Sequence, residues 1–203
     1  MVDLRNRKPL GRGLDAVMEA ASQAAAFGTA PSENGAQMFG HVPHIAPEAY
    51  FHIIFPPLDA RELADLERSL HCSIPESYRN LLVVTNGLHL FGGKLTLDGL
   101  RTDYSRKPGI RLPFDLSDPN VHERPRAADP TWFLFGFYSE DGSQAYIDPA
   151  DGRVYRGNRN LTQPRLNHWE SLDDYLEQEI RRMASLFDDR GRLREKSKPT
   201  TPN

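Results

Sequence analysis

The spacing of apolar residues changes along the chain from a helical period to a strand period and back. Between residues 59 and 86 apolar side chains repeat every three or four positions, which predicts two consecutive amphipathic helices. Asp59 and Glu62 form a capping-box pattern at the start of the first helix. Pro75 suits the first turn of the second helix, and Asn86-Gly87 can end it. The two apolar faces comprise Leu63, Leu66, Leu70, Ile74, Tyr78, Leu81, Leu82 and Thr85.

Past residue 90, short apolar or alternating runs are separated by turn residues, which is the pattern of β-strands. Gly136 is a candidate bulge within one of these runs. The turns Asp141-Gly142 and Asp151-Gly152 join the last three runs into an antiparallel meander. A further apolar run at residues 50–58, stopped by two prolines, precedes the helices. The four expected strands after residue 90 are 94–98, 132–138, 143–148 and 153–157.

A final helix is expected from Ser171, which can cap it, to about Phe187. The helix pair, the meander and this closing helix together predict a single α+β domain, which we place at residues 48–189. Within it, residues 101–130 contain several prolines and many charges, which predicts a long excursion at the surface.

The segments that flank this domain differ from it in composition. Residues 1–47 begin with a basic arm and continue with a short helix at 14–27, where helix propensity is high. They end in a linker at residues 28–47 that is rich in Gly, Pro, Ser and Asn. Residues 190–203 are expected to form a basic, disordered tail.

The net charge of −3 is distributed unevenly along the chain. Residues 44–189 hold 16 Lys or Arg and 23 Asp or Glu, a net charge of −7, whereas residues 190–203 carry a net charge of +4. An acidic body repels nucleic acid and attracts basic partners, although the same charge can serve solubility alone. We therefore expect a protein partner and no direct contact with nucleic acid.

Composition also bears on compartment and membrane association. A single cysteine, Cys72, allows no intramolecular disulfide and no cysteine-based zinc cluster. No apolar run approaches the roughly 18 residues of a membrane span. The N-terminus is charged and weakly apolar, which is unlike a signal peptide. We expect a cytoplasmic protein that does not associate with membranes.

Residues that could support catalysis form no recognisable motif. The seven histidines match no metal-binding spacing, and His41 and His44 lie beside Pro43 in the expected linker. Cys72 is better explained as a small buried thiol than as a nucleophile activated by His71. Phosphate-binding loops and nucleophile elbows are absent from the sequence. We predict no catalytic residue, no metal, no cofactor and no small-molecule substrate, and an enzyme is the least favoured class.

Three blocks of sequence carry a resemblance to a known superfamily. They are LADLERSLHCSIPESYRNLLVVTNG (63–87), FLFGFYSEDGSQAYIDPADGRVYRG (133–157) and HWESLDDYLEQEI (168–180). In this order they resemble the SUKH superfamily, of Smi/Knr type, which includes bacterial immunity proteins encoded beside polymorphic toxins and a yeast regulator of cell-wall synthesis. The resemblance spans most of residues 59–187. Residues 1–43 lie outside it, and the excursion is long for the family pattern.

The resemblance implies an N-terminal helix pair packed on an antiparallel meander sheet, with a closing C-terminal helix. Members of the superfamily look like binding modules. The leading hypothesis is therefore an immunity protein that neutralises a cognate bacterial toxin, such as a nuclease, by occluding its active site. The alternative is a regulatory or scaffold module with several weak partners, as in the yeast branch. The signature residues, which have structural roles in this interpretation, are Pro75, Tyr78, Leu82, Asn86, Gly87, Gly136, Gly142, Gly152 and Trp169.

Partner-binding side chains are expected on the turns and on the sheet surface, where they do not disturb the core. An active site that holds phosphates is basic, so carboxylates ringing a few aromatic anchors are the matching chemistry. Each candidate can alternatively be a turn former or a core aromatic. The candidates are Asp98, Asp103, Tyr104, Glu140, Asp141, Tyr146, Asp148, Asp151 and Tyr155.

Overall fold

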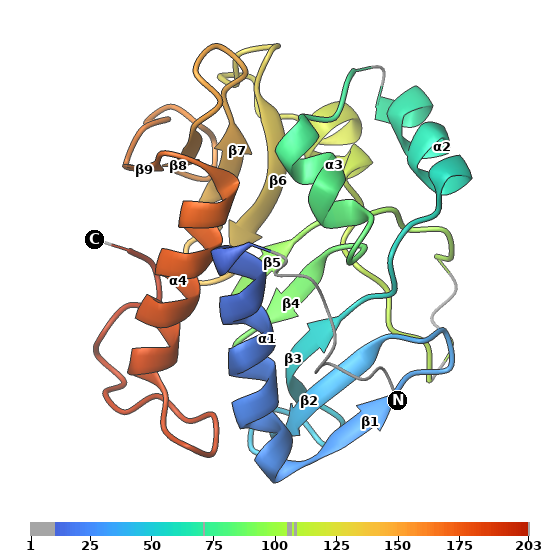
Figure 1. Cartoon of the computed structure of the whole chain (residues 1–203). Coiled ribbons are helices and arrows are strands. Elements are labelled where there is room, and N and C mark those ends of the chain that lie inside the picture. Colours follow the sequence, from blue (N-terminus) through green and yellow to red (C-terminus); the bar gives the residue numbers. More distant parts are fainter. Residues whose placement is uncertain (1–10, 71, 105–106, 108, 203) are drawn as a thin grey trace.

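Nine antiparallel strands form one sheet in the computed structural model, which describes residues 11–70, 72–104, 107 and 109–202 (Figure 1). Each strand pairs with the next one along the chain, so the sheet is a continuous meander. The α+β class and the closing C-terminal helix are confirmed. The strands are β1 (Thr29–Pro31), β2 (Gln37–His41), β3 (Tyr50–Ile54), β4 (Leu88–Leu90), β5 (Leu95–Leu97), β6 (Phe133–Tyr138), β7 (Gln144–Ile147), β8 (Val154–Gly157) and β9 (Asn167–Trp169).

Helices α1 and α4 lie side by side across one face of the sheet (Figure 1). Gly13 allows the two helices to approach closely, since a Cβ there would lie 2.7 Å from the carbonyl oxygen of Asp173. Arg12 adds an ion pair to Asp174 at 2.8 Å. The helix expected at residues 14–27 corresponds to α1 and η1. The helices are α1 (Arg12–Ala24), the 3-10 turn η1 (Ala25–Phe27), α2 (Ala60–Leu70), α3 (Glu76–Leu82), the π-turn η2 (Asp118–His122) and α4 (Leu172–Leu186).

The segment 28–47, expected to be a linker, instead forms the hairpin of β1 and β2 at the edge of the sheet. Its turn is closed by a hydrogen bond from Gly35 N to Ser32 O at 3.0 Å, and Gly35 has a φ of 87°. Hairpin turns and linkers both favour Pro, Ser, Asn and Gly, so composition alone does not distinguish them. The folded unit therefore begins before residue 48. Residues 1–10 of the expected arm lie outside the described residues.

The helix pair follows its expected pattern closely. Asp59 and Glu62 form the capping box, since each main-chain N–H donates to the carboxylate of the other, at 2.9 and 2.8 Å. Pro75 occupies the N-cap position, one residue before the first turn of α3. The helix ends at Leu82, which is buried, and not at Asn86 as expected.

Asn86 and Gly87 build the turn that leads from α3 into β4. The Asn86 side chain donates to Leu100 O at 2.8 Å and accepts from Leu100 N at 2.6 Å. Gly87 has a φ of 89°, and a Cβ there would meet Leu97 O at 2.5 Å. The signature residues Asn86 and Gly87 are therefore explained by the structure of this turn.

The meander of β6, β7 and β8 is confirmed, with a register shift between Leu134 and Gly136 that marks the expected bulge. Gly142 and Gly152 take φ values of 71° and 72° in the two turns, a conformation that favours glycine. Trp169 lies in β9, just before Ser171 caps α4, and its ring meets Tyr175 edge-on at 4.8 Å.

Two layers of buried side chains result from this arrangement. The main core lies between the sheet and the helices. A smaller cluster on the opposite face comprises Leu134, Tyr146, Tyr155 and Leu161. Cys72, expected to be buried, is exposed, because it follows the last turn of α2. Among the described residues, no helix has the length and apolar character that crossing a bilayer requires.

Candidate protein-binding groove

The loop between β5 and β6, expected as a long excursion at the surface, is attached to the sheet by hydrogen bonds. Main-chain hydrogen bonds join Gly99 N to Phe114 O at 2.8 Å and Leu116 N to Gly99 O at 2.9 Å. The amide of Asn120 donates to Leu134 O at 2.7 Å and accepts from Leu134 N at 3.0 Å. This side chain takes the place of a neighbouring strand beside the bulge of β6, and it fixes the loop.

A groove of about 620 Å³ lies between this loop and strands β5 to β7. Phe137 of β6 lines it on the sheet face opposite α4. The adjacent Tyr138 points the other way and donates to Glu179 of α4 at 2.9 Å, and consecutive strand residues alternate between faces. Phe114 of the loop meets Phe137 edge-on, with ring centroids 5.1 Å apart. The groove therefore has an aromatic wall on a rigid support.

Carboxylates dominate the lining of this groove. Among the described residues, Arg159 is the one basic side chain that lines it. Such a concentration of one charge creates a strong local field that attracts cations. The six acidic lining residues are Asp98, Asp115, Asp118, Glu123, Glu140 and Asp141.

Asp98 is the most deeply buried of these acids, with 3% of its surface exposed. Within the part of the chain that the structure describes, its Oδ1 atom is buried without a hydrogen-bond partner. Burial, followed by the charges of Asp118 and Asp115, holds the pKa of Asp98 well above its usual range. Burial and the charges of Asp115 and Glu123 also raise the pKa of Asp118. The acids at this end of the groove thus repel one another.

Asp115 and Tyr104 form a bonded pair at the edge of the groove. Asp115 Oδ1 accepts from Ser117 N at 2.9 Å and from Ser117 Oγ at 2.7 Å, while Oδ2 accepts from the Tyr104 hydroxyl. This hydrogen bond is the main reason that the pKa of Tyr104 rises to about 12. Tyr104 is 65% exposed, and the Arg101 guanidinium lies 5.0 Å from its ring centroid. Asp103 accepts from Arg101 through its main-chain oxygen at 3.3 Å.

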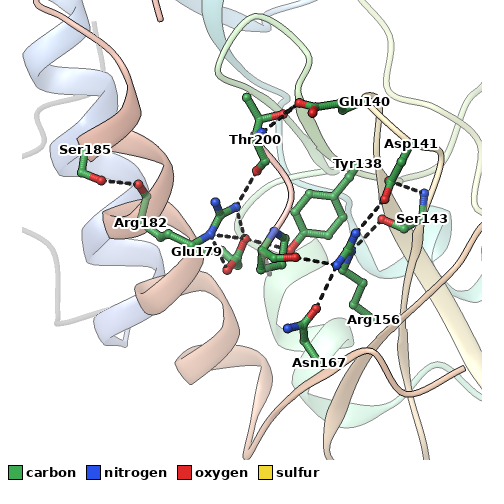
Figure 2. Close-up of polar contacts among 11 residues, drawn as sticks. Tyr138, Glu140, Asp141, Ser143, Arg156, Asn167, Glu179, Arg182, Ser185 and Thr200 are labelled. Atoms are coloured by element: carbon green, nitrogen blue, oxygen red, sulfur yellow. Dashed lines mark hydrogen bonds and ion pairs between the residues drawn. The ribbon is translucent and has the colours of Figure 1, made fainter. Parts of the chain in front are cut away.

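Glu140 and Asp141, at the other end of the groove, accept hydrogen bonds from within the chain that stabilise their charged forms (Figure 2). Glu140 accepts from Thr200 N at 2.8 Å and from the Thr200 hydroxyl. Asp141 accepts from Arg156 at 2.7 Å and from Ser143 N at 2.8 Å. Partial burial opposes ionisation of both acids, but these hydrogen bonds outweigh it and lower the pKa of each. Asp141 is therefore already paired with a cation of the chain, whereas the Oδ1 atom of Asp98 has no hydrogen-bond partner among the described residues.

The C-terminal segment, expected to be a disordered tail, docks against this network (Figure 2). Thr200 is fully buried, and its carbonyl oxygen accepts from Arg182 of α4 at 2.6 Å. Arg156, which is 5% exposed, donates to Pro202 O at 2.7 Å. The bonds are made to the main chain and to Thr200, whereas the charged side chains that suggested disorder are exposed. The folded unit thus also extends past residue 189.

The other four candidates lie on β7, β8 and the turn between them, away from the groove. Tyr146 and Tyr155 are buried and stacked with ring centroids 5.6 Å apart. Asp148 is buried and paired with Arg165 at 3.1 Å. Asp151 is exposed and accepts from the Tyr155 hydroxyl at 2.6 Å. The expectation of surface exposure is therefore wrong for Tyr146, Tyr155 and Asp148, and also for Asp98.

Three of the nine candidates, Asp98, Glu140 and Asp141, come together in the groove. The groove also contains residues that were not among the candidates, namely Asp115, Asp118, Glu123, Phe114 and Phe137. The acidic residues within the segment 101–130 were the sequence feature that could have indicated this groove. Their position on the sheet depends on the Asn120 side chain, which no local pattern indicates.

The acidic groove with its aromatic wall is the candidate site for contact with another protein. In the described part of the chain, no group of three or more His, Cys, Asp or Glu residues could hold a metal ion. The chain belongs to the SMI1/KNR4 family (SUKH-1), whose model matches residues 57–178. This range includes every residue that lines the groove, whereas α1 and β1 to β3 lie outside it. A search of curated proteins found no match.

Proposed function

We propose that this protein is a cytoplasmic immunity protein that binds a cognate bacterial toxin and occludes its active site with the acidic groove. The observation that carries the proposal is the six-carboxylate lining beside the Phe114 and Phe137 rings. Active sites that hold phosphates, as those of nucleases do, present basic side chains. A fixed acidic surface can take the place of the substrate phosphates and exclude the substrate.

The chemistry of the groove supports a protein partner more than any other ligand. Its charge repels nucleic acid and free phosphate. The proposal needs no catalytic residue, because binding alone neutralises the toxin. The exposed, single Cys72 fits a reducing compartment such as the cytoplasm.

Binding to the product of the neighbouring gene tests this proposal. We expect the full-length chain to form a complex with that product, to inhibit its activity and to rescue cells that express it. In a double variant, Asp118→Asn with Glu123→Gln, the loss of two exposed groove charges should weaken binding by about tenfold. The effect should decrease as salt is raised.

A matched control uses Asp15→Asn with Glu19→Gln. Both residues are exposed on α1, across the sheet from the groove, and the change in net charge is the same. Affinity should stay within about twofold of the wild type. An equal loss in both double variants would show that net charge, and not the groove, determines binding.

The alternative is a regulatory or scaffold module, as in the other branch of the superfamily. It is favoured by the exposed Tyr104 and Phe114 on the loop, which can contact partners independently of any active site. It predicts that this protein forms several weak complexes in a lysate. It also predicts that this protein does not rescue cells that express the product of the neighbouring gene. Absence of both a complex and a rescue would reject the immunity proposal.

A further inference from the structure

Asp98 combines a fixed main chain with a carboxylate whose Oδ1 atom has no hydrogen-bond partner among the described residues. Its N–H donates to Phe135 O at 2.7 Å, and its carbonyl oxygen accepts from the Tyr78 hydroxyl at 2.6 Å. Both bonds involve main-chain atoms of Asp98, so they fix its position at the end of β5 independently of its side chain. Within the described chain, no other carboxylate oxygen is both buried and without a hydrogen bond. An unpaired buried charge is costly, so proteins normally pair such groups.

Other buried acids of this chain show the usual solution. Glu179 binds Arg182 and the Tyr138 hydroxyl, and Asp148 binds Arg165. Two described cations near the groove, Arg101 and Arg159, are used elsewhere or lie apart from Asp98. Arg101 donates to Asp103 O and lies over the Tyr104 ring. Arg159 lies beside Gly142 at the opposite end of the lining.

The surroundings of Asp98 match the chemistry of one particular cation. The same groove contains the Phe114 and Phe137 rings and a second carboxylate, that of Asp118. A guanidinium group is planar, stacks on aromatic rings, is weakly hydrated and offers several donors to carboxylates. An ammonium group is compact and strongly hydrated, so it loses more on entering a buried site.

We propose that the Asp98 end of the groove is an arginine-binding slot, in which a guanidinium of the partner binds the Asp98 carboxylate and packs against Phe137 and Phe114. The inference rests on the proposed function of the groove and specifies which partner side chain it receives. The burial that raises the pKa of Asp98 then has a purpose, because an entering cation restores its ionised form.

The test uses the full-length chain and N-acetyl-L-arginine methylamide as the probe. We expect saturable shifts of the Asp98 carboxyl carbon and of the Phe137 ring signals in NMR spectra. The corresponding citrulline compound, which is neutral and of similar shape, and the corresponding lysine compound should each bind about tenfold more weakly. In Asp98→Asn, affinity for the arginine probe should also fall by about tenfold, which equals about 1.4 kcal/mol.

Asp189→Asn is the matched control, since Asp189 is exposed beyond α4 and the charge change is the same. Its affinity should stay within about twofold of the wild type. Equal binding of the arginine and lysine probes, or equal binding by wild type and Asp98→Asn, would overturn the slot. The wild-type titration needs no variant, so a folding defect in Asp98→Asn leaves the test intact.

The two proposals fail separately. If the toxin binds and the Asp118/Glu123 double variant weakens it, but the arginine probe leaves Asp98 unshifted, then the slot is wrong and the groove proposal stands. If the arginine probe binds at Asp98 but no toxin complex forms, the slot stands and the immunity function is wrong.

Discussion

Replacing Asp98 by asparagine should stabilise the protein at neutral pH. In the folded chain, burial and the charges of Asp118 and Asp115 hold the pKa of Asp98 well above its usual range. In the unfolded chain the carboxyl returns to about 3.9. The hydrogen bonds of Asp98 to Tyr78 and Phe135 involve only its main chain, so Asp98→Asn keeps them. The substitution removes the titratable carboxyl group at nearly constant shape.

The size of the effect follows from proton linkage. Between the two pKa values the folded chain binds one proton more than the unfolded chain. The free energy of unfolding therefore falls as pH rises, by about 1.4 kcal/mol for each pH unit. This contribution is fully present below about pH 3.9 and is lost as pH rises through the folded pKa. Asp98→Asn lacks this titration, so its stability relative to wild type should increase with pH from the unfolded pKa up to the folded pKa.

Urea unfolding of wild type, Asp98→Asn and Asp189→Asn from pH 4 to pH 7 measures this difference. Buried His52 and His89, whose pKa values burial lowers to about 3 and about 4, give both proteins the opposite slope below pH 6.5. Their contribution cancels when the variant is compared with wild type. Parallel curves for wild type and Asp98→Asn would refute the assignment of a costly, unpaired carboxylate.

Three other substitutions test the supports of the groove by urea unfolding. Tyr78→Phe removes the hydroxyl that donates to Asp98 O at 2.6 Å and should cost about 1–2 kcal/mol; an unchanged midpoint would contradict this bond. Thr200→Val should cost about 1 kcal/mol and speed amide exchange at residue 200, unless the C-terminal segment is not docked on Glu140. Gly136→Ala places a Cβ against Thr96 O at the bulge and should cost roughly 3 kcal/mol; a neutral effect would show that the bulge relaxes.

Most of the fold could be predicted because local signals specify it. The Asp59–Glu62 capping box, the Ser171 cap and the two glycine turns each act within a few residues. The β1–β2 hairpin escaped prediction because its turn has the composition of a linker. The docking of Thr200 escaped prediction because it depends on Arg182 and Glu140, which are distant in sequence.

The groove could be predicted only in part, and for a related reason. Asp98 lies at the end of a strand and Asp141 lies in a turn, and residues at such positions are usually expected to be exposed. Burial of Asp98 results from the loop that Asn120 attaches to Leu134, a contact between segments that no periodicity indicates. The same contact brings Asp118 to the groove. Sequence patterns thus identify which residues can carry charge, whereas long-range hydrogen bonds decide which of them meet.

Asp98 should affect both the stability of the fold and the binding of a partner. Comparing these two effects in Asp98→Asn distinguishes a carboxylate used for binding from one used for structure. A ligand that binds only the folded chain stabilises it in proportion to its occupancy. A cation in the slot should therefore raise the free energy of unfolding of the wild type, because it pairs with the Asp98 carboxylate. It should raise the free energy of unfolding of Asp98→Asn much less. The variant should be the more stable protein without ligand and the weaker binder. The exposed Asp118 and Glu123 should instead affect binding with little change in stability. If Asp98 were a structural residue, its neutralisation would lower stability.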